Sequence, residues 1–346
     1  MSVEHLRQSL AAKILATGVG SLPHGNAAAA EALVWDRLLD HAPFWAQLPR
    51  RSFLENMYVQ FGEQLPGLRL DAGQKTVWVD TEAPSYLKDF EACFTKIQER
   101  DVDGFGISRD AGLGLYLLAQ RLEDQGWQGW VKAQVIGPVS LGLTLLDQKK
   151  TPILHNAELA ELLPAYLALK AAWLIRQVRA HAETKILVFD DEPYLVALGT
   201  SACSLPRETI LRMIDTVVAT IHADGALAGI HCCGNTDWDL VMATKADIVS
   251  FDAFGYLDKF LLYEKALAAF LGRGGILAAG IVPNTEAVDD GGLEDALGDI
   301  LARHRDLFAN GGLITASCGC AALTEERAAR ALDLSVRLSR RLQSLL

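Results

Sequence analysis

The chain is poor in three features that define whole classes of protein: cysteine, net positive charge and long apolar runs. Its 346 residues include only 6 cysteines, unevenly spaced, which excludes a secreted scaffold held together by disulfides. Asp and Glu number 43 against 32 Lys and Arg, for a formal net charge of -11. Nucleic acid and anionic membrane surfaces are therefore not expected as partners. No uninterrupted apolar run reaches about 18 residues, the length of a membrane span.

The first residues, Met-Ser-Val-Glu-His-Leu-Arg, lack the basic segment, apolar core and cleavage site of a signal peptide. Together with the scarcity of cysteine, this predicts a cytoplasmic protein with reduced thiols. Half of the residues are hydrophobic and 22% are charged, a balance typical of a folded chain and not of a disordered one.

Short β-branched runs that end in Gly, Pro or an acidic residue alternate with longer segments of helical periodicity. The predicted strands are Ile14–Ser21, Thr76–Asp80 or Gly104–Ser108, Val131–Gly137, Lys185–Asp190, Gly229–Cys232, Asp247–Phe251, Ile276–Val282 and Leu313–Ser317. The predicted helices include Leu162–His181, Glu208–Asp224, Tyr256–Leu271, Gly291–Phe308 and Thr324–Leu346. Eight such units predict one (β/α)8 TIM barrel, an α/β domain over residues 1–346.

An open doubly wound sheet is the competing fold. It is disfavoured because no Gly-x-Gly-x-x-Gly follows a strand and opens a helix, and no phosphate-binding loop is present. The stretch from about residue 24 to 130 is less regular and contains Pro43, Pro49, Pro66 and Pro84. We interpret it as a long excursion after the first strand.

Chemically active residues follow the predicted strands, where a TIM barrel places its reactive groups. The strongest combination is His231-x-Cys233 with Cys318 or Cys320 far downstream. Imidazole and thiolate are zinc ligands, and three ligands on separated strands leave a fourth position open for substrate. The alternative is a group of ordinary buried cysteines.

Two further patterns have both a functional and a structural interpretation. Asp190-Asp191-Glu192-Pro193 places three carboxylates at a strand end, where one could bind a cationic group of a substrate. Carboxylates are equally favourable in an acidic turn or at a helix N-terminus. Gly18-Val19-Gly20-Ser21 could present backbone N–H groups to a ligand or simply form a tight turn.

In their order along the chain, these patterns resemble the catalytic C-terminal barrel of cobalamin-independent methionine synthases, within the uroporphyrinogen decarboxylase-like superfamily. The resemblance covers nearly the whole chain. Gly20-Ser21-Leu22-Pro23, Phe61-Gly62-Glu63-Gln64-Leu65-Pro66-Gly67, Gly137-Pro138-Val139-Ser140 and Asp191-Glu192-Pro193 are similar to that family's Gly-Ser-Phe-Pro, Phe-Gly-Glu-Gln-Leu-Asp-Gly, Gly-Pro-Val-Thr and Asp-Glu-Pro. The run from His231 to Thr236 also resembles the His-x-Cys-Gly-Asn-Thr of corrinoid:coenzyme M methyltransferases.

The resemblance implies a zinc ion held by His231, Cys233 and Cys318. Cys318 is preferred to Cys320 because a glycine follows it, as in the family. Asp252 falls at the position of the family's zinc-linked Glu, and is expected to act as a catalytic residue or metal ligand.

The resemblance also implies a substrate site. Gly20 and Ser21 would hold a carboxylate, and Asp191 would hold an amino group as a catalytic residue. The family's second amine-binding Glu falls near Val59, so Glu55 is the nearest acidic residue that could replace it.

The implied activity is transfer of a methyl group to a small thiol, homocysteine or an analogue. The family's acidic His motif, Asp-Ile-His-Ser-Pro, is replaced by Ala279-Gly280-Ile281-Val282-Pro283, and the second barrel that helps to bind folate is missing. We therefore expect a methylcorrinoid donor, free or carried by a partner protein. The alternatives are a decarboxylase of the same superfamily, which needs no metal, and a non-catalytic protein that binds a thiol or a corrinoid.

Overall fold

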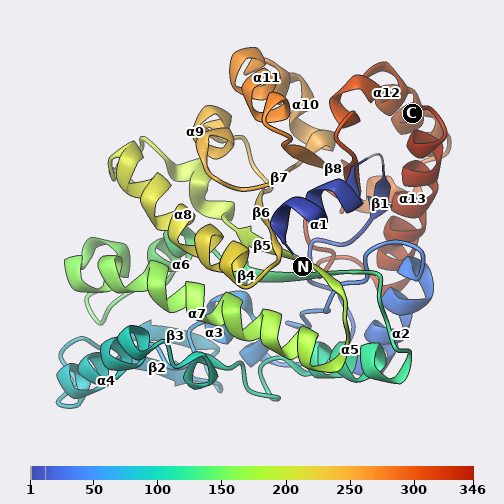
Figure 1. The fold of residues 1–346 in the computed structure, drawn as a ribbon. Helices are drawn as coiled ribbons and strands as arrows, with labels where there is room; N and C mark the ends of the chain where they lie inside the picture. The colour runs from blue at the N-terminus through green and yellow to red at the C-terminus, as the bar shows by residue number, and fades with distance from the viewer. Residues whose placement is uncertain (1, 12) are drawn as a thin grey trace.

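Seven parallel strands form a curled sheet at the centre of the structure, a computed structural model that describes residues 2–11 and 13–346 (Figure 1). Their order across the sheet is β1-β9-β8-β7-β6-β5-β4. The strands are β1 (Ile14–Ala16), β4 (Trp130–Ile136), β5 (Lys185–Asp191), β6 (Leu227–Cys232), β7 (Ile248–Phe251), β8 (Ile276–Val282) and β9 (Gly312–Ala316). The sequence predicts each of them at the correct place in the chain.

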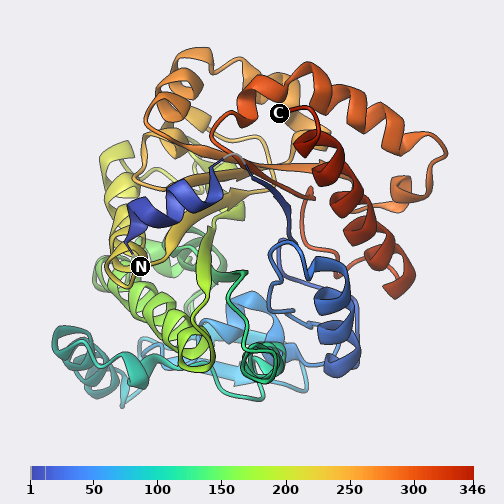
Figure 2. The ribbon, with the colours of Figure 1, turned by 45° about the vertical axis from the view of Figure 1, so that its right-hand side comes forward.

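Most of the helices cover the outer face of this sheet (Figure 2). In chain order, the helices of the described chain are α1 (Val3–Leu10), α2 (Ala27–Leu38), α3 (Met57–Gln60), α4 (Tyr86–Glu99), α5 (Leu113–Asp124), α6 (Pro138–Thr144), α7 (Ala157–His181), α8 (Arg207–Ala223), α9 (Trp238–Ala243), α10 (Ala253–Leu261), α11 (Glu264–Gly272), α12 (Leu293–Arg303) and α13 (Glu325–Gln343). No helix of the described chain is both long and apolar enough to cross a bilayer.

Side chains alternate between the two faces of each strand, as the pleat requires. On β5, Leu187 and Phe189 point into the enclosed space, where they pack with Leu6 and Leu10 of α1. Ile186 and Val188 belong instead to the larger core beneath the helices. Helix α1 therefore closes the end of the sheet at which the strands begin, and the strand ends on the opposite side remain available for a site.

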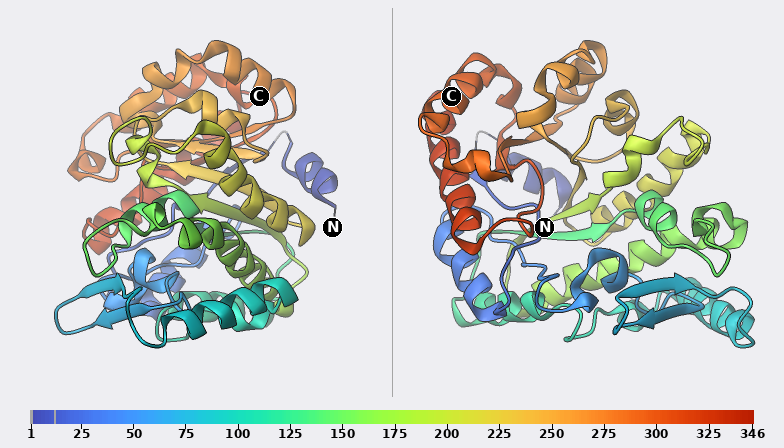
Figure 3. Two further views of the ribbon diagram at one scale, coloured as in Figure 1. Left: turned by 90° about the vertical axis from the view of Figure 1, so that its left-hand side faces the viewer. Right: turned by 180° about the vertical axis from the view of Figure 1, so that it is seen from behind.

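The predicted second strand needs correction. Thr76–Asp80 contributes to β3 (Thr76–Val79), which pairs antiparallel with β2 (Leu68–Asp71) outside the main sheet. Gly104–Ser108 overlaps a 3-10 turn, Val102–Phe105. The excursion after β1 contains this hairpin together with α4, and both lie along one edge of the molecule (Figure 3).

An extended segment, residues 42–47, lies where the second strand is expected, between edge strands β1 and β4. The N–H of Ala42 donates to Ala16 O at 3.1 Å, and the N–H of Lys132 donates to Pro43 O at 2.8 Å. Only single bridges form, at Phe44 and at Gln47. Because Pro43 has no N–H, it cannot contribute a donor to a regular ladder. Within the described residues, the main sheet thus has seven strands where the sequence predicts eight.

Two predicted helices are also shorter than expected. The segment Tyr256–Leu271 is divided into α10 and α11, and Gly291–Phe308 into α12 and a 3-10 turn, Arg305–Phe308. The predicted segments Leu162–His181 and Glu208–Asp224 agree with α7 and α8 within a few residues at each end.

Asp247 ties α1 to the sheet. Its fully buried carboxylate accepts hydrogen bonds from Arg7 Nε at 2.7 Å and from the N–H of Ala228 at 2.8 Å, and lies 2.8 Å from His222 Nε2. Burial alone would raise the pKa of Asp247. The hydrogen bonds from His222 and Ala228, together with the positive charge of Arg7, outweigh burial and lower it.

We expect Asp247→Asn to lower the free energy of unfolding by about 2 kcal/mol near pH 7, because it removes one charge from a buried, hydrogen-bonded network. A carboxylate with a lowered pKa stabilises the folded chain above its unfolded pKa of about 3.9, and this contribution is lost as the pH falls through the folded value. Urea unfolding from pH 7 to pH 3 should therefore show the difference from wild type shrinking below about pH 4. Asp306→Asn, at a side chain that is 94% exposed, is the control and should leave stability unchanged.

Candidate metal centre

Three of the predicted metal ligands meet at the strand ends. His231 lies on β6, Cys233 follows that strand, and Cys318 follows β9. One potential ligand atom from each residue lies within 4.8 Å of the others. Strands β7 and β8 separate β6 from β9 in the sheet, so this proximity depends on the curl of the sheet.

His231 is held by one ring nitrogen and leaves the other unused. Its Nδ1 lies 2.9 Å from Ser250 Oγ on the neighbouring strand β7. Its Nε2 is buried and has no hydrogen-bond partner within residues 2–11 and 13–346. A buried polar atom without a partner costs about 1–3 kcal/mol, and metal-bound histidines usually anchor their second nitrogen in this manner. The orphaned nitrogen therefore fits a metal ion.

The two thiols interact with each other. The hydrogen bond from Cys318 lowers the pKa of Cys233 against the opposing effect of burial. The same hydrogen bond, together with burial, raises the pKa of Cys318. A divalent cation bound here would displace the thiol protons, because a coordinating thiol is deprotonated.

The structure distinguishes Cys318 from the other cysteines near the strand ends. Cys320 is buried, and its backbone N–H donates to Ser21 O at 2.8 Å. Cys232 points away from the enclosed space, where its thiol contacts Gly234 O at 3.7 Å. Burial raises the pKa of each of these thiols to about 12. Neither belongs to the cluster around His231.

A cavity of about 280 Å³ opens beside the three ligand atoms. Its walls are Val19, Ser21, Gln47, Pro49, Glu55, Asn56, Met57, Tyr58, Asp191, Pro193, His231, Cys233, Cys318 and Gly319. The predicted substrate-binding residues Ser21, Glu55 and Asp191 are thus brought together with the predicted metal ligands.

Asp191 faces this cavity from β5, in register with His231 on β6. Its Oδ1 is buried without a hydrogen-bond partner in the described part of the chain. Burial raises the pKa of Asp191, and the positive charge of Lys132 opposes that effect. The carboxylate is therefore available to a cationic group of a ligand.

Lys132 is a buried charged residue beside Asp191 that the sequence analysis does not single out. It is buried on β4, donates to Val19 O and, at 3.1 Å, to Gln134 Oε1, and burial lowers its pKa to about 8. The available signal was the alternation in Trp130-Val131-Lys132-Ala133-Gln134, which places polar side chains on the face that points into the barrel.

Gly20 and Gly319 permit close approach of the chain around Ser21. Gly20 has φ +155, and a Cβ there would lie 2.6 Å from Gln134 Nε2. A Cβ on Gly319 would lie 2.1 Å from Ser21 Oγ. Glycine is therefore required at both positions, and Ser21 can face the cavity beside Cys318.

Glu55 already has partners within the protein. Its carboxylate accepts from Arg51 and from the N–H of Leu48 at 2.7 Å. Burial raises its pKa, and these hydrogen bonds oppose the effect. Its charge is therefore less available to a ligand than that of Asp191.

Asp252 lies outside the cluster of three ligand atoms. Its Oδ1 accepts from the N–H of Gly255 at 2.7 Å, which caps the N-terminus of α10. Burial raises its pKa, and His231 is close enough to oppose that rise electrostatically. Its role as a metal ligand therefore stays a prediction.

The three consecutive acidic residues, 190–192, have different surroundings. Glu192 accepts from the N–H groups of Val139 at 2.9 Å and Ser140 at 2.7 Å, at the start of α6. A Cβ on Gly137 would lie 2.1 Å from the Glu192 carboxyl carbon, which explains this glycine. The helix-terminus interpretation therefore applies to Glu192, whereas Asp191 faces the cavity. Asp190 points away from the cavity, and burial raises its pKa well above the ordinary value.

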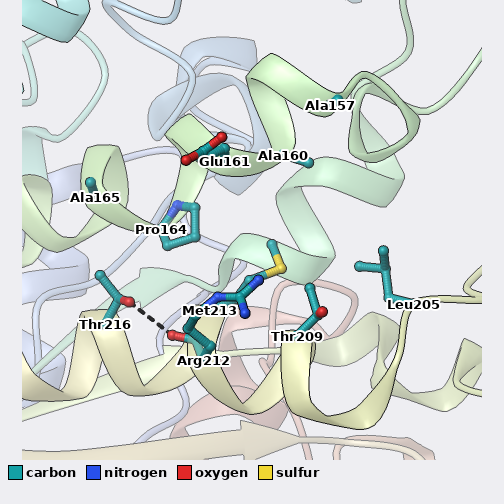
Figure 4. Close-up of a pocket in the computed structure, with 10 residues that line it drawn as sticks. All are labelled: Ala157, Ala160, Glu161, Pro164, Ala165, Leu205, Thr209, Arg212, Met213 and Thr216. Atoms are coloured by element: carbon teal, nitrogen blue, oxygen red, sulfur yellow. Dashed lines mark hydrogen bonds between the residues drawn. The ribbon is translucent and has the colours of Figure 1, made fainter.

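Another cavity, of about 460 Å³, lies between α7 and α8, in the outer layer (Figure 4). Its charged lining residues are Glu161 and Arg212, and it contains no thiol or imidazole. In the cavity beside His231, by contrast, an imidazole, two thiols and a carboxylate converge.

No family model matches the chain, and no curated protein matches it. Solved structures do. A methyltransferase from Methanosarcina mazei is similar with a TM-score of 0.56 over 96% of both chains, at 11% identity. A protein assigned as a vitamin-B12 independent methionine synthase from Listeria monocytogenes gives a TM-score of 0.45 at 15% identity, over 81% of this chain and 76% of the other. At such an identity the first likeness shows the fold alone.

Metal content tests the ligand set. We expect the purified chain to bind about one equivalent of zinc, and His231→Ala, Cys233→Ala and Cys318→Ala each to retain less than about half, because each removes one of three protein ligands. Cys320→Ala is the matched control and should keep its zinc. Mass-spectrometric metal analysis after dialysis, with circular dichroism to confirm folding, provides the measurement. Unchanged zinc in the Cys233 and Cys318 variants would exclude the site.

Proposed function

We propose that the chain is a zinc-dependent methyltransferase that moves a methyl group from a methylcorrinoid to homocysteine or a related small thiol. The observation that carries this proposal is the cluster of His231, Cys233 and Cys318, whose ligand atoms lie within 4.8 Å of one another in the wall of a cavity. One imidazole and two thiols from two strand ends leave room for a substrate atom, as in catalytic zinc sites.

A free thiol has a pKa of about 8.5, so that only a few per cent is the nucleophilic thiolate at neutral pH. Zinc bound by these three residues would hold the substrate sulfur as a thiolate. The pocket residues then position the substrate. Asp191 would accept the ammonium group, and Ser21 with Gly20 would hold the carboxylate.

The cavity also limits access of water to the reacting sulfur. Pro49, Met57 and Pro193 contribute apolar walls around the polar groups. A thiolate with fewer water contacts is a stronger nucleophile towards a methyl carbon. We further propose that Asp252 completes the site when substrate binds, exchanging the N–H of Gly255 for a new partner.

The absence of an acid on β8 supports the choice of donor. The segment Ala279-Gly280-Ile281-Val282 belongs to this strand and carries no titratable side chain. In the proposed step the sulfur forms a bond to the methyl carbon while the carbon–cobalt bond breaks, and both electrons of that bond stay with the cobalt. The leaving corrinoid takes up no proton, so no general acid is needed. The thiol proton leaves when the sulfur binds.

The decarboxylase alternative gives the three metal ligands no role, because that chemistry needs no metal. The non-catalytic alternative keeps the pocket without turnover. Activity measurements separate it from the proposed function.

Activity with methylcobalamin tests the proposal. We expect the zinc-loaded chain to accelerate demethylation of methylcobalamin by homocysteine at least about 100-fold over Cys233→Ala, since transition-state stabilisation of this order is modest for an enzyme. Absorbance follows the corrinoid, and mass spectrometry identifies the methylated thiol. Absence of acceleration with every thiol in a panel, in a chain that holds zinc, would exclude this function and favour a binding protein or another donor.

Substitution of Asp191 tests how the amino group is held. We expect Asp191→Asn to raise KM for homocysteine about tenfold or more, because a charge-assisted hydrogen bond contributes about 1.5–3 kcal/mol. The same substitution should raise KM much less for 3-mercaptopropionate, a thiol without an amino group. An equal rise in KM for both thiols would mean that Asp191 acts on the metal site and not on the amino group.

A further inference from the structure

A second built cavity, of about 560 Å³, lies at the end of the sheet where the strands begin. It lies opposite the metal centre, between edge strands β1 and β4 and beside the C-terminal turn of α13, which packs along β1 (Figure 1). Its walls are Lys13, Ile14, Leu15, Leu39, Asp40, His41, Trp127, Gly129, Trp130, Lys185, Arg340, Gln343 and Ser344. The proposed methyl transfer uses none of these residues.

Two buried N–H donors in this wall have no acceptor. His41 is 7% exposed, and its Nδ1 accepts from the N–H of Ala16 at 3.2 Å. Because Nδ1 accepts this hydrogen bond, it carries no proton, and the ring proton resides on Nε2. This Nε2 and the indole Nε1 of Trp130, which is 3% exposed, are both buried without a partner among the described residues.

Unused buried donors cost about 1–3 kcal/mol each. Neither the neutral Nε2–H of His41 nor the indole N–H of Trp130 can accept a hydrogen bond. The partner that would offset this cost must therefore be an acceptor. Both residues line the same cavity, but the two donor atoms are covered in this structure, so a ligand reaches them only when these side chains turn towards it.

The charges around these donors favour an anion. Lys13, Lys185 and Arg340 line the cavity, against the single carboxylate of Asp40. Arg340 Nη2 lies 3.8 Å from Asp40 Oδ2, so that carboxylate is already shared. Within residues 2–11 and 13–346, neither Lys13 nor Lys185 has a carboxylate partner, and the Lys185 ammonium lies 5.9 Å from the ring centre of Trp130.

Such a concentration of positive charge is unusual on a chain of net charge -11. Beside it, Ile14, Leu15, Leu39 and Trp127 contribute an apolar wall. A ligand that satisfies both halves has an anionic head and an apolar body.

We propose that this cavity binds a small organic carboxylate with an aromatic or branched aliphatic body. The carboxylate accepts from His41 Nε2–H and Trp130 Nε1–H and neutralises Lys13 and Lys185, while the body packs against the leucine and tryptophan side chains. The volume of about 560 Å³ exceeds that of the cavity at the metal centre and is within the range of small-molecule sites.

Benzoate and its uncharged counterpart benzyl alcohol test this proposal on the full-length chain. The readout is the indole N–H resonance of Trp130, assigned with Trp130→Phe and followed by transverse-relaxation-optimised NMR on 15N-labelled protein. We expect benzoate to move this resonance saturably with a Kd of about 1 mM or lower, and benzyl alcohol to leave it in place.

Substitution of the two lysines provides a second test. Lys13→Ala/Lys185→Ala should weaken benzoate binding by about tenfold or more, whereas Lys88→Ala/Lys265→Ala, at exposed lysines on α4 and α11, should leave the Kd unchanged. The proposal is overturned if benzoate does not move the Trp130 resonance, if benzyl alcohol moves it equally, or if the Lys13/Lys185 variant binds benzoate as tightly as wild type.

Discussion

The curl of the parallel sheet is the constraint on which the rest of the structure depends. In a flat sheet with strands about 4.8 Å apart, the ends of β6 and β9 would be separated by the width of two intervening strands. In this chain the ligand atoms that follow these two strands lie within 4.8 Å of one another. The segment 42–47 stabilises the curl, because it hydrogen-bonds to both edge strands. Any change that breaks the contacts of residues 42–47 with β1 and β4 would also move the two thiols apart.

Buried charge then orients the groups that the curl brings together. Lys132 lies inside the sheet with Asp191, where each charge lowers the cost of burying the other. The carboxylate of Glu192, the next residue, accepts hydrogen bonds from the first N–H groups of α6. Neighbouring carboxylates on one strand end thus serve opposite faces, one towards the cavity and one towards the helix layer. The alternation of the strand makes this division unavoidable.

Much of this could be predicted from the sequence because strand ends carry strong local signals. His231, Cys233 and Cys318 were placed correctly as neighbours, since a barrel gathers strand ends at one mouth. The second strand could not be predicted, because residues 42–47 bond through single bridges to two distant strands and show no periodicity of their own. Thr76–Val79 showed the required β-branched pattern but pairs in a local hairpin. Long-range pairing decided both cases.

The orientation of the helices also sorts the charges of the molecule. Each βα unit directs the N-terminus of its helix towards the strand ends, where the positive end of the helix dipole favours carboxylates and thiolates. Glu192 at α6 and Asp252 at α10 occupy such positions. The C-terminal ends point the other way, where cations are favoured, and Arg340 lies in the last turn of α13 beside the second cavity. The polarity of the repeated unit therefore gathers carboxylates and thiols at the end of the sheet where the strands finish, and basic side chains at the end where they begin.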